Sequence, residues 1–164
     1  MTETIRETHL IARPGEASYT VLRDFDATPE LVFRAYSEPE LYVRWHACDA
    51  MEIVAEKFEC RTGGSYRIVE TVVGADAYAV RGVFHEVRNP GLIVKTIESA
   101  SHPGHVALEV TRFEALPDKR TRMTGITYLQ SVAKRDEWVR LGVEKGTREA
   151  HGYLRALLQE LSQA

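Results

Sequence analysis

Cysteine is scarce in this chain: Cys48 and Cys60 are the only two among 164 residues, and they form no Cys-x-x-Cys pair. This pattern favours free thiols over a disulfide. Long hydrophobic runs are also missing, since no stretch approaches the roughly 18 consecutive apolar residues of a membrane span. The first residues carry Glu3, Arg6 and Glu7 in place of the apolar core of a signal peptide. We therefore expect a cytoplasmic protein that does not associate with membranes.

Neither sign of charge dominates the sequence. It has 21 Lys and Arg against 24 Asp and Glu, a net charge of −3, and the two signs are interspersed. A nucleic-acid groove or a surface for anionic lipids needs a concentration of basic residues. Nucleic acid and membranes are therefore not expected partners.

Motifs of common catalytic and cofactor sites are absent as well. The sequence has no Gly-x-Ser-x-Gly elbow, Walker loop or dinucleotide fingerprint, which disfavours hydrolase, kinase and dehydrogenase chemistry. His102 and His105 flank a Pro-Gly turn, but no third or fourth ligand lies near them in the sequence, so a zinc site is not expected. The predicted protein uses no metal and no cofactor.

What the sequence does contain is the pattern of one α+β domain. Residues 1–17 are weakly patterned and predict an N-terminal arm, followed by a single domain over residues 18–164. Alternation from Tyr19 to Phe25 predicts a strand whose apolar face is interrupted by Arg23. Thr28 followed by Pro29 is a strong helix start, and Ser37 is expected to cap a second short helix directly after the first.

The middle of the chain is rich in β-branched and aromatic residues separated by short turn signals. Short connections allow only antiparallel neighbours, so these segments predict a meander that gives, with the first strand, a sheet of about seven strands. The expected strands lie near 51–58, 65–73, 78–88, 92–99, 105–114 and 121–130. Such a sheet must bury its apolar face against the one long helix available.

The last thirty residues predict that long helix. Its expected buried stripe has small residues first and large ones later, and His151 falls on the expected solvent side. The stripe consists of Val139, Gly142, Gly146, Ala150, Tyr153, Leu157 and Leu161. Glycines on a buried stripe indicate either close packing on the sheet or the wall of a cavity anchored by the large residues, and both interpretations stay open.

Several local strings resemble one known family. Residues 28–36, the segment 38–41 and the pair Arg44-Trp45 look like the helix-pair segment of the START-like (SRPBCC) superfamily. They are most similar to the bacterial group related to the activator of the heat-shock-protein-90 ATPase. Residues 63–67, 82–87 and 144–149 agree, so that the resemblance covers about residues 18–162.

The resemblance implies a helix-grip fold, also called Bet v 1-like, with a largely apolar cavity between the sheet and the C-terminal helix. Members of this fold bind hydrophobic molecules, and some are cyclases. Family members usually carry an aromatic residue where this chain has His46. Members that act on the chaperone tend to have a separate N-terminal domain, for which this chain has no room, so direct chaperone activation is not expected.

Three residues carry the candidate polar chemistry. If Gly82, Phe84 and Glu86 face inward, Glu86 is a carboxylate in an apolar pocket with a raised pKa, suited to proton transfer. The alternative is a structural salt link between Glu86 and Arg23 or another strand arginine, and Arg23 is otherwise an anchor for a ligand carbonyl or carboxylate. His46 at the cavity mouth is the second candidate catalytic group.

The leading hypothesis is a binding protein for a small hydrophobic molecule of lipid-like, aromatic or polyketide-like character. The second is a cyclase or dehydratase that uses Glu86 or His46. The third is an interaction module that contacts a chaperone or another protein through the outer sheet face; the oligomeric state stays open. The predicted ligand-binding residues are Arg23, Trp45, His46, Tyr66, Phe84, Glu86, Tyr128, Trp138, Gly142 and Gly146.

Overall fold

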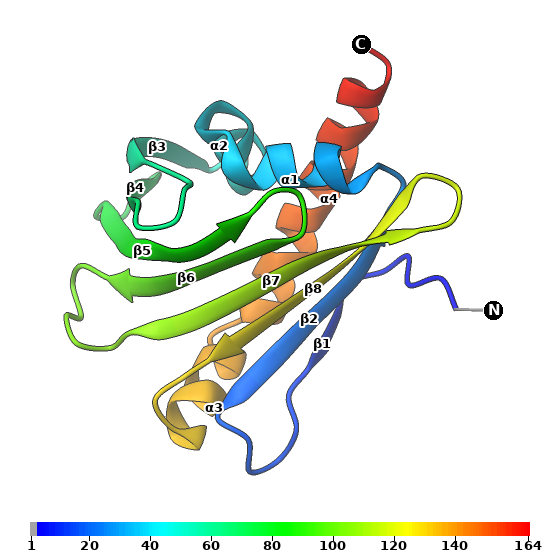
Figure 1. The fold of residues 1–164 in the computed structure, drawn as a ribbon. Coiled ribbons are helices and arrows are strands. Elements are labelled where there is room, and N and C mark those ends of the chain that lie inside the picture. The colour runs from blue at the N-terminus through cyan, green and yellow to red at the C-terminus, as the bar shows by residue number, and fades with distance from the viewer. Residues whose placement is uncertain (1–2) are drawn as a thin grey trace.

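The computed structural model of the chain describes residues 3–164 and shows an antiparallel sheet curved around a C-terminal helix (Figure 1). The sheet has the order β1-β2-β8-β7-β6-β5-β4-β3, so β3 to β8 form the predicted meander and β2 joins it beside β8. The strands are β1 (His9–Ile11), β2 (Ser18–Phe25), β3 (Met51–Phe58), β4 (Ser65–Val72), β5 (Tyr78–Arg88), β6 (Leu92–Ser99), β7 (Ala107–Leu116) and β8 (Arg120–Tyr128). The predicted α+β helix-grip architecture is confirmed.

The sheet has eight strands instead of about seven, because part of the N-terminal arm pairs with β2. His9, Leu10 and Ile11 lie opposite Leu22, Val21 and Thr20. A three-residue strand is too short to show an alternating pattern, which explains why it was not predicted. The boundary near residue 17 itself stays a prediction.

A buried carboxylate ties the arm to the sheet. Asp24 accepts hydrogen bonds from Arg122 Nε and Nη2 at 2.8 and 2.9 Å, and from the backbone N–H of Ile5 at 2.8 Å. Burial alone raises the pKa of an aspartate, but Arg122 and the Ile5 N–H outweigh it and leave the pKa of Asp24 below its ordinary value. The arm before β1 is therefore held by a charged group.

The helix pair follows β2 as predicted and comprises α1 (Pro29–Ser37) and α2 (Pro39–His46). Thr28 Oγ1 accepts a hydrogen bond from the N–H of Leu31 at 3.4 Å, which confirms the predicted cap. The prediction that Ser37 caps α2 is wrong. Ser37 is the last residue of α1, and Glu38 is the cap residue of α2 without a side-chain capping bond. Proline at the first position of α2 supplies the helix start instead.

The predicted single C-terminal helix is also wrong, because the structure divides it into α3 (Val132–Arg140) and α4 (Val143–Ser162). Gly142 lies between them with φ +96°, a left-handed conformation that ends one helix before the next begins. Figure 1 shows α3 as a short helix at the lower end of the sheet and α4 running behind the strands. The three- and four-residue spacing of apolar residues continues across this break, so the hydrophobic pattern alone does not indicate that the helix is interrupted.

The buried side of α4 is rotated by about one residue from the predicted stripe. His151, Leu154, Leu157 and Leu158 are buried, with His151 only 3% exposed, so its predicted place on the solvent side is wrong. Tyr153, predicted as an anchor, is 42% exposed. Among residues 3–164, no helix combines the length and the apolar character that a bilayer crossing requires.

Candidate functional site

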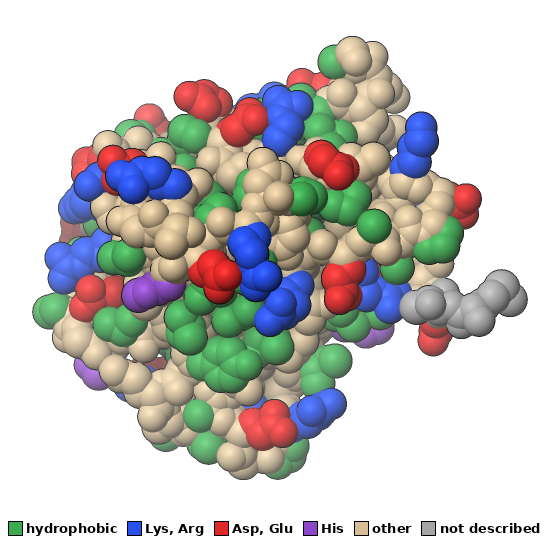
Figure 2. Space-filling view, in the orientation of Figure 1, with side chains coloured by type: hydrophobic (Ala, Val, Ile, Leu, Met, Phe, Trp, Pro, Cys, Tyr) green, Lys and Arg blue, Asp and Glu red, His purple; other side chains and the backbone are tan. Residues whose placement is uncertain are grey.

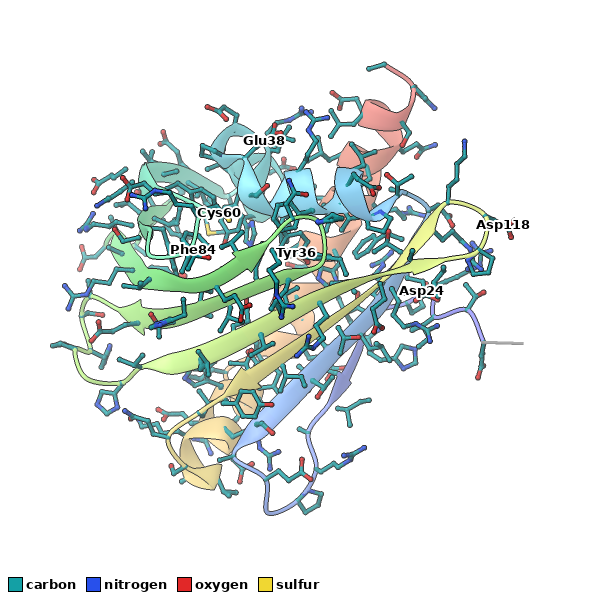
Figure 3. All side chains as sticks on the ribbon, in the orientation of Figure 1. Asp24, Tyr36, Glu38, Cys60, Phe84 and Asp118 are labelled. Atoms are coloured by element: carbon teal, nitrogen blue, oxygen red, sulfur yellow. The ribbon has the colours of Figure 1, made fainter. Side chains whose placement is uncertain are left out.

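A cavity of about 410 Å³ lies between the concave face of the sheet and α4, next to the helix pair. Strand alternation points one side chain in two toward it, among them Tyr66 and Ile68 from β4 and Glu109 and Thr111 from β7. Its wall carries four tyrosines, two histidines and one lysine; these are Tyr19, Tyr36, Tyr42, Tyr66, His46, His151 and Lys95. Figure 3 shows Tyr36 below α1, between the helix pair and the sheet.

Lys95 is a buried cation on the cavity wall. Its Nζ lies 3.6 Å from Glu109 Oε1, and 5.4 and 5.1 Å from the ring centres of Tyr42 and Tyr66. Burial disfavours the charge, but Tyr42, Glu109 and Tyr66 outweigh it and raise the pKa of Lys95 above its ordinary value. Lys95 is therefore expected to keep its charge at neutral pH, where one carboxylate and two aromatic faces balance it.

His46 lies at the end of α2 and stacks on Tyr42, with ring centres 3.8 Å apart. Its Nδ1 lies 2.9 Å from the carbonyl oxygen of Tyr42. Burial is the main cause that lowers the pKa of His46 to about 3; Lys95 and His151 lower it further, while the Tyr42 carbonyl opposes them. The imidazole is therefore neutral at physiological pH.

His151 belongs to a buried hydrogen-bonded chain that begins in the N-terminal arm. Thr8 Oγ1 lies 2.9 Å from His151 Nδ1 and 3.1 Å from Arg23 Nη1, and Thr8 is 1% exposed. Burial, followed by the nearby charge of Arg23, lowers the pKa of His151 to about 3. His151 is the second neutral imidazole on the cavity wall.

The tyrosine hydroxyls also stay uncharged. Tyr66 donates to the carbonyl of Thr96 at 2.7 Å, and burial is the main reason that its pKa lies above the ordinary value. Burial likewise raises the pKa of Tyr19 to about 12, although a bond with Thr127 opposes the shift. Gly82 makes room for the Tyr66 ring, because a Cβ there would collide with the Thr96 backbone and with that ring. The wall is therefore polar in places but carries few charges.

Four of the predicted ligand-binding residues line the cavity: Trp45, His46, Tyr66 and Gly146. Trp45 donates its indole N–H to the carbonyl of Ala35 at 2.8 Å, so its ring is fixed. Gly146 is exposed and marks a place on α4 where the cavity meets solvent. A ligand-binding role for these residues stays a prediction.

Two more predicted residues lie behind the cavity wall. Phe84 is 1% exposed and packs behind Tyr66 at a ring distance of 5.3 Å; Figure 3 shows it beside the β4–β5 region. Arg23 is 8% exposed and reaches the cavity only through Thr8 and His151. Both support the wall without lining it.

The other four predicted residues lie elsewhere. Glu86 is exposed and pairs with Arg88 of the same strand at 2.8 Å. The predicted pocket carboxylate is therefore wrong, and the alternative of a salt link to a strand arginine is confirmed, with Arg88 in place of Arg23. An irregularity in the β5–β6 pairing between Phe84 and Glu86 changes the side to which the strand presents its residues. The remaining three are Tyr128, 45% exposed on β8, Trp138, half-buried on α3, and Gly142, exposed at the helix break.

Sequence reasoning missed Lys95, Glu109, Tyr42 and His151, which form most of the polar wall. On β6, Lys95 is two residues from Ile93 and from Ile97, so all three side chains lie on the same face of the strand. The two isoleucines on this face are the signal that places the Lys95 side chain inside. The contact of Thr8 with His151 joins residues 143 positions apart and has no local signal.

The cysteines are free thiols, as predicted. Within residues 3–164, His, Cys, Asp and Glu form no group of three or more that could hold a metal ion. The exposed surface is mixed. Leu108 lies opposite Tyr128, and both are partly exposed. Figure 2 shows hydrophobic and charged side chains interspersed over the visible face.

Comparison with known families agrees with this architecture. The family model described as "Activator of Hsp90 ATPase homolog 1-like protein" matches residues 26–159. The chain belongs to this family. The predicted resemblance is thus confirmed, while the family match leaves out the arm that carries Thr8.

Two bacterial proteins of known structure are similar in fold over nearly the whole chain. A protein from Arthrobacter aurescens has a TM-score of 0.83 at 22% identity, over 93% of this chain and 91% of its own. A protein from Rhodobacter sphaeroides has a TM-score of 0.84 at 21% identity, over 94% and 99%. An HSP90 activator from Plasmodium falciparum is more distant, with a TM-score of 0.57 at 16% identity over 74% and 86%. No curated protein matches the sequence.

Proposed function

We propose that this protein binds a small, mainly aromatic molecule in the cavity between the sheet and α4. The observation that carries the proposal is the cavity itself, about 410 Å³ in volume with aromatic rings on its wall. This volume lies within the range of roughly 300–1,000 Å³ typical of ligand sites, which combine an apolar wall with a few orienting polar groups.

The binding free energy comes chiefly from apolar burial. Burying about 200 Å² of a ring system at about 25 cal/mol per Å² contributes about 5 kcal/mol before the costs of immobilisation. Stacking and edge contacts with rings such as Trp45 and Tyr42 add about 0.5–1.5 kcal/mol each. We therefore expect dissociation constants in the micromolar range for a ligand of suitable shape.

A pair of glycines on α4 provides a matched test. Gly146 lines the cavity, Gly152 does not, and a Cβ built at either position meets no atom within 4 Å. Gly146→Leu and Gly152→Leu therefore make the same chemical change on the same helix, and both remove the helix-destabilising effect of glycine.

The neutral dye N-phenyl-1-naphthylamine, whose fluorescence rises in apolar surroundings, serves as the probe. The wild type and Gly152→Leu are expected to bind it with similar affinity, and Gly146→Leu to bind it at least about tenfold more weakly. Equal affinity for all three, with the fold intact by circular dichroism, contradicts binding in this cavity.

An enzyme that transfers protons on a similar ligand is the second candidate, and the neutral ring of His46 on the cavity wall is the observation in its favour. A base with a pKa near 3 is weak at neutral pH, which ranks this candidate below passive binding. Its test is turnover of a bound hydroxy-ketone that depends on His46 and is lost in His46→Asn.

A further inference from the structure

The hydrogen bonds of His46 assign its tautomer. A backbone carbonyl can only accept, so the 2.9 Å contact with Tyr42 O requires the proton of the neutral ring to be on Nδ1. Nε2 is then an unprotonated nitrogen with a free lone pair. His46 therefore offers the cavity a hydrogen-bond acceptor.

The chain behind His151 assigns the opposite tautomer. The guanidinium of Arg23 can only donate, so Thr8 Oγ1 accepts from it. Among residues 3–164, His151 is the only other side chain hydrogen-bonded to this buried hydroxyl, so the hydroxyl proton is satisfied only by donation to His151. His151 Nδ1 is consequently an acceptor in its 2.9 Å contact with Thr8, and the ring proton is on Nε2. His151 therefore offers a hydrogen-bond donor.

Neither Nε2 atom is fully buried. Among residues 3–164, Arg23 Nε is the only fully buried side-chain nitrogen or oxygen that has no hydrogen-bond partner. Neither Nε2 takes part in a hydrogen bond of the described chain, so neither is closed off by protein, and both rings line the cavity. Both rings lie close to that of Trp45, with ring centres 3.6 Å away for His46 and 6.4 Å away for His151.

The charge balance of the wall selects against ionic ligands. The charge of Lys95 is already compensated by Glu109, and Glu70 at the cavity accepts from the hydroxyl of Tyr78. A ligand carboxylate would add a charge without its own counter-ion, and an amine would meet the ammonium of Lys95.

From this arrangement we infer that the ligand is a neutral hydroxy-carbonyl aromatic molecule. Its hydroxyl donates to Nε2 of His46 and its carbonyl oxygen accepts from Nε2–H of His151. Thr8, in the arm outside the family match, acts as a positioning residue because its hydroxyl fixes the tautomer of His151. The inference rests on the proposed function and adds the class of the ligand.

Four naphthalene probes of similar size separate the contributions of the ligand hydroxyl, carbonyl and charge to binding. Their affinities are measured by isothermal titration calorimetry at pH 6.5. 6-Hydroxy-2-acetonaphthone has both groups; 6-methoxy-2-acetonaphthone lacks the donor; 6-ethyl-2-naphthol lacks the carbonyl; 6-hydroxy-2-naphthoic acid replaces the ketone with a carboxylate. The first is expected to bind at least about fivefold more tightly than each of the others, because each has lost one hydrogen bond or gained a buried charge.

Variants assign each preference to its residue. His46→Asn keeps a donor for the Tyr42 carbonyl but loses the acceptor, so the hydroxy and methoxy ketones are expected to bind within about twofold of each other. His151→Phe is expected to remove the preference for the acetyl over the ethyl compound. His85→Asn, at an exposed position on β5, is the control and should retain both preferences.

The tautomers of His46 and His151 can be measured directly, since ¹⁵N NMR of histidine side chains distinguishes protonated from unprotonated ring nitrogens. Nδ1–H for His46 and Nε2–H for His151 are expected, and Thr8→Val should disturb only the second. The opposite tautomers, tighter binding of the naphthoic acid, or equal loss for both ketones in His46→Asn overturns the ligand class. Binding of N-phenyl-1-naphthylamine that depends on Gly146 would still support the proposed function, so the two failures are distinguishable.

Discussion

The ion pair between Lys95 and Glu109 offers the sharpest test of the cavity's energetics. The side chains are 12% and 26% exposed and their charged atoms are 3.6 Å apart. Lys95→Met keeps an unbranched side chain of similar length but leaves the Glu109 carboxylate without its counter-ion. Glu109→Gln does the reverse, and the double variant removes both charges.

The expected magnitudes follow from this geometry. At an effective dielectric constant of about 20, two unit charges 3.6 Å apart attract each other by about 4–5 kcal/mol, and part of this is offset by the cost of burying Lys95. The two ring contacts of Lys95 add about 0.5–1 kcal/mol each. We expect Lys95→Met to lower the free energy of unfolding by about 2–4 kcal/mol, and the double variant by less than the sum of the single variants.

Urea unfolding followed by tryptophan fluorescence measures these values, and the m-value shows whether the unfolding remains two-state. Lys57→Met is the matched control, because Lys57 pairs with Glu59 at 3.5 Å but both side chains are about half exposed. It should change the free energy of unfolding by less than about 0.5 kcal/mol. A coupling energy between Lys95 and Glu109 below about 0.5 kcal/mol would refute the argument that the pair is effectively buried.

Three further predictions concern stability. Asp24→Asn should cost about 2–4 kcal/mol in urea unfolding and speed amide exchange in the arm, because a buried charge pair loses one partner; an unchanged exchange rate at Ile5 would contradict this. Gly142→Ala should destabilise by about 1–3 kcal/mol because φ is +96°, whereas Gly152→Ala on regular helix should stabilise by up to about 1 kcal/mol; thermal melts that shift in the same direction would refute the contrast. Since the pKa of His151 is depressed from 6.5 to about 3, the unfolded state binds a proton between these values and the folded state does not. Stability should therefore fall by about 2 kcal/mol from pH 7 to pH 5 on account of this residue alone, and His151→Phe should show a correspondingly shallower dependence in urea titrations.

The fold was predictable because its signals are local. Alternation and turn residues mark strands β3 to β8, and Thr28 with Pro29 marks the start of α1. The break at Gly142 was not predictable, because the same glycine is compatible with a helix interior and with the left-handed turn that it adopts. Sequence spacing does not report a backbone angle.

The candidate site was predictable only in part. The position of each polar side chain depends on which face of its strand or helix it occupies and on contacts between residues far apart in the sequence. Tyr66 follows the alternation of β4 and lines the cavity, whereas the irregularity after Phe84 moves Glu86 to the outside. His151 was misplaced because the phase of a helical stripe read from small residues was wrong by about one residue. Only tertiary structure brings Thr8 next to it.

If the proposed function holds, we expect selectivity in this cavity to depend more on its polar groups than on its apolar wall. Because the cavity of about 410 Å³ meets solvent beside Gly146, a ligand that binds there must displace water. When no ligand is bound, we expect water to satisfy the free nitrogens of His46 and His151. A purely apolar ligand gains burial energy but leaves those donors and acceptors unpaired, at about 1–3 kcal/mol each. Only a molecule that replaces these hydrogen bonds keeps the full gain, so we expect a hydroxyl and a carbonyl on one aromatic frame to fit the cavity better than a larger hydrocarbon.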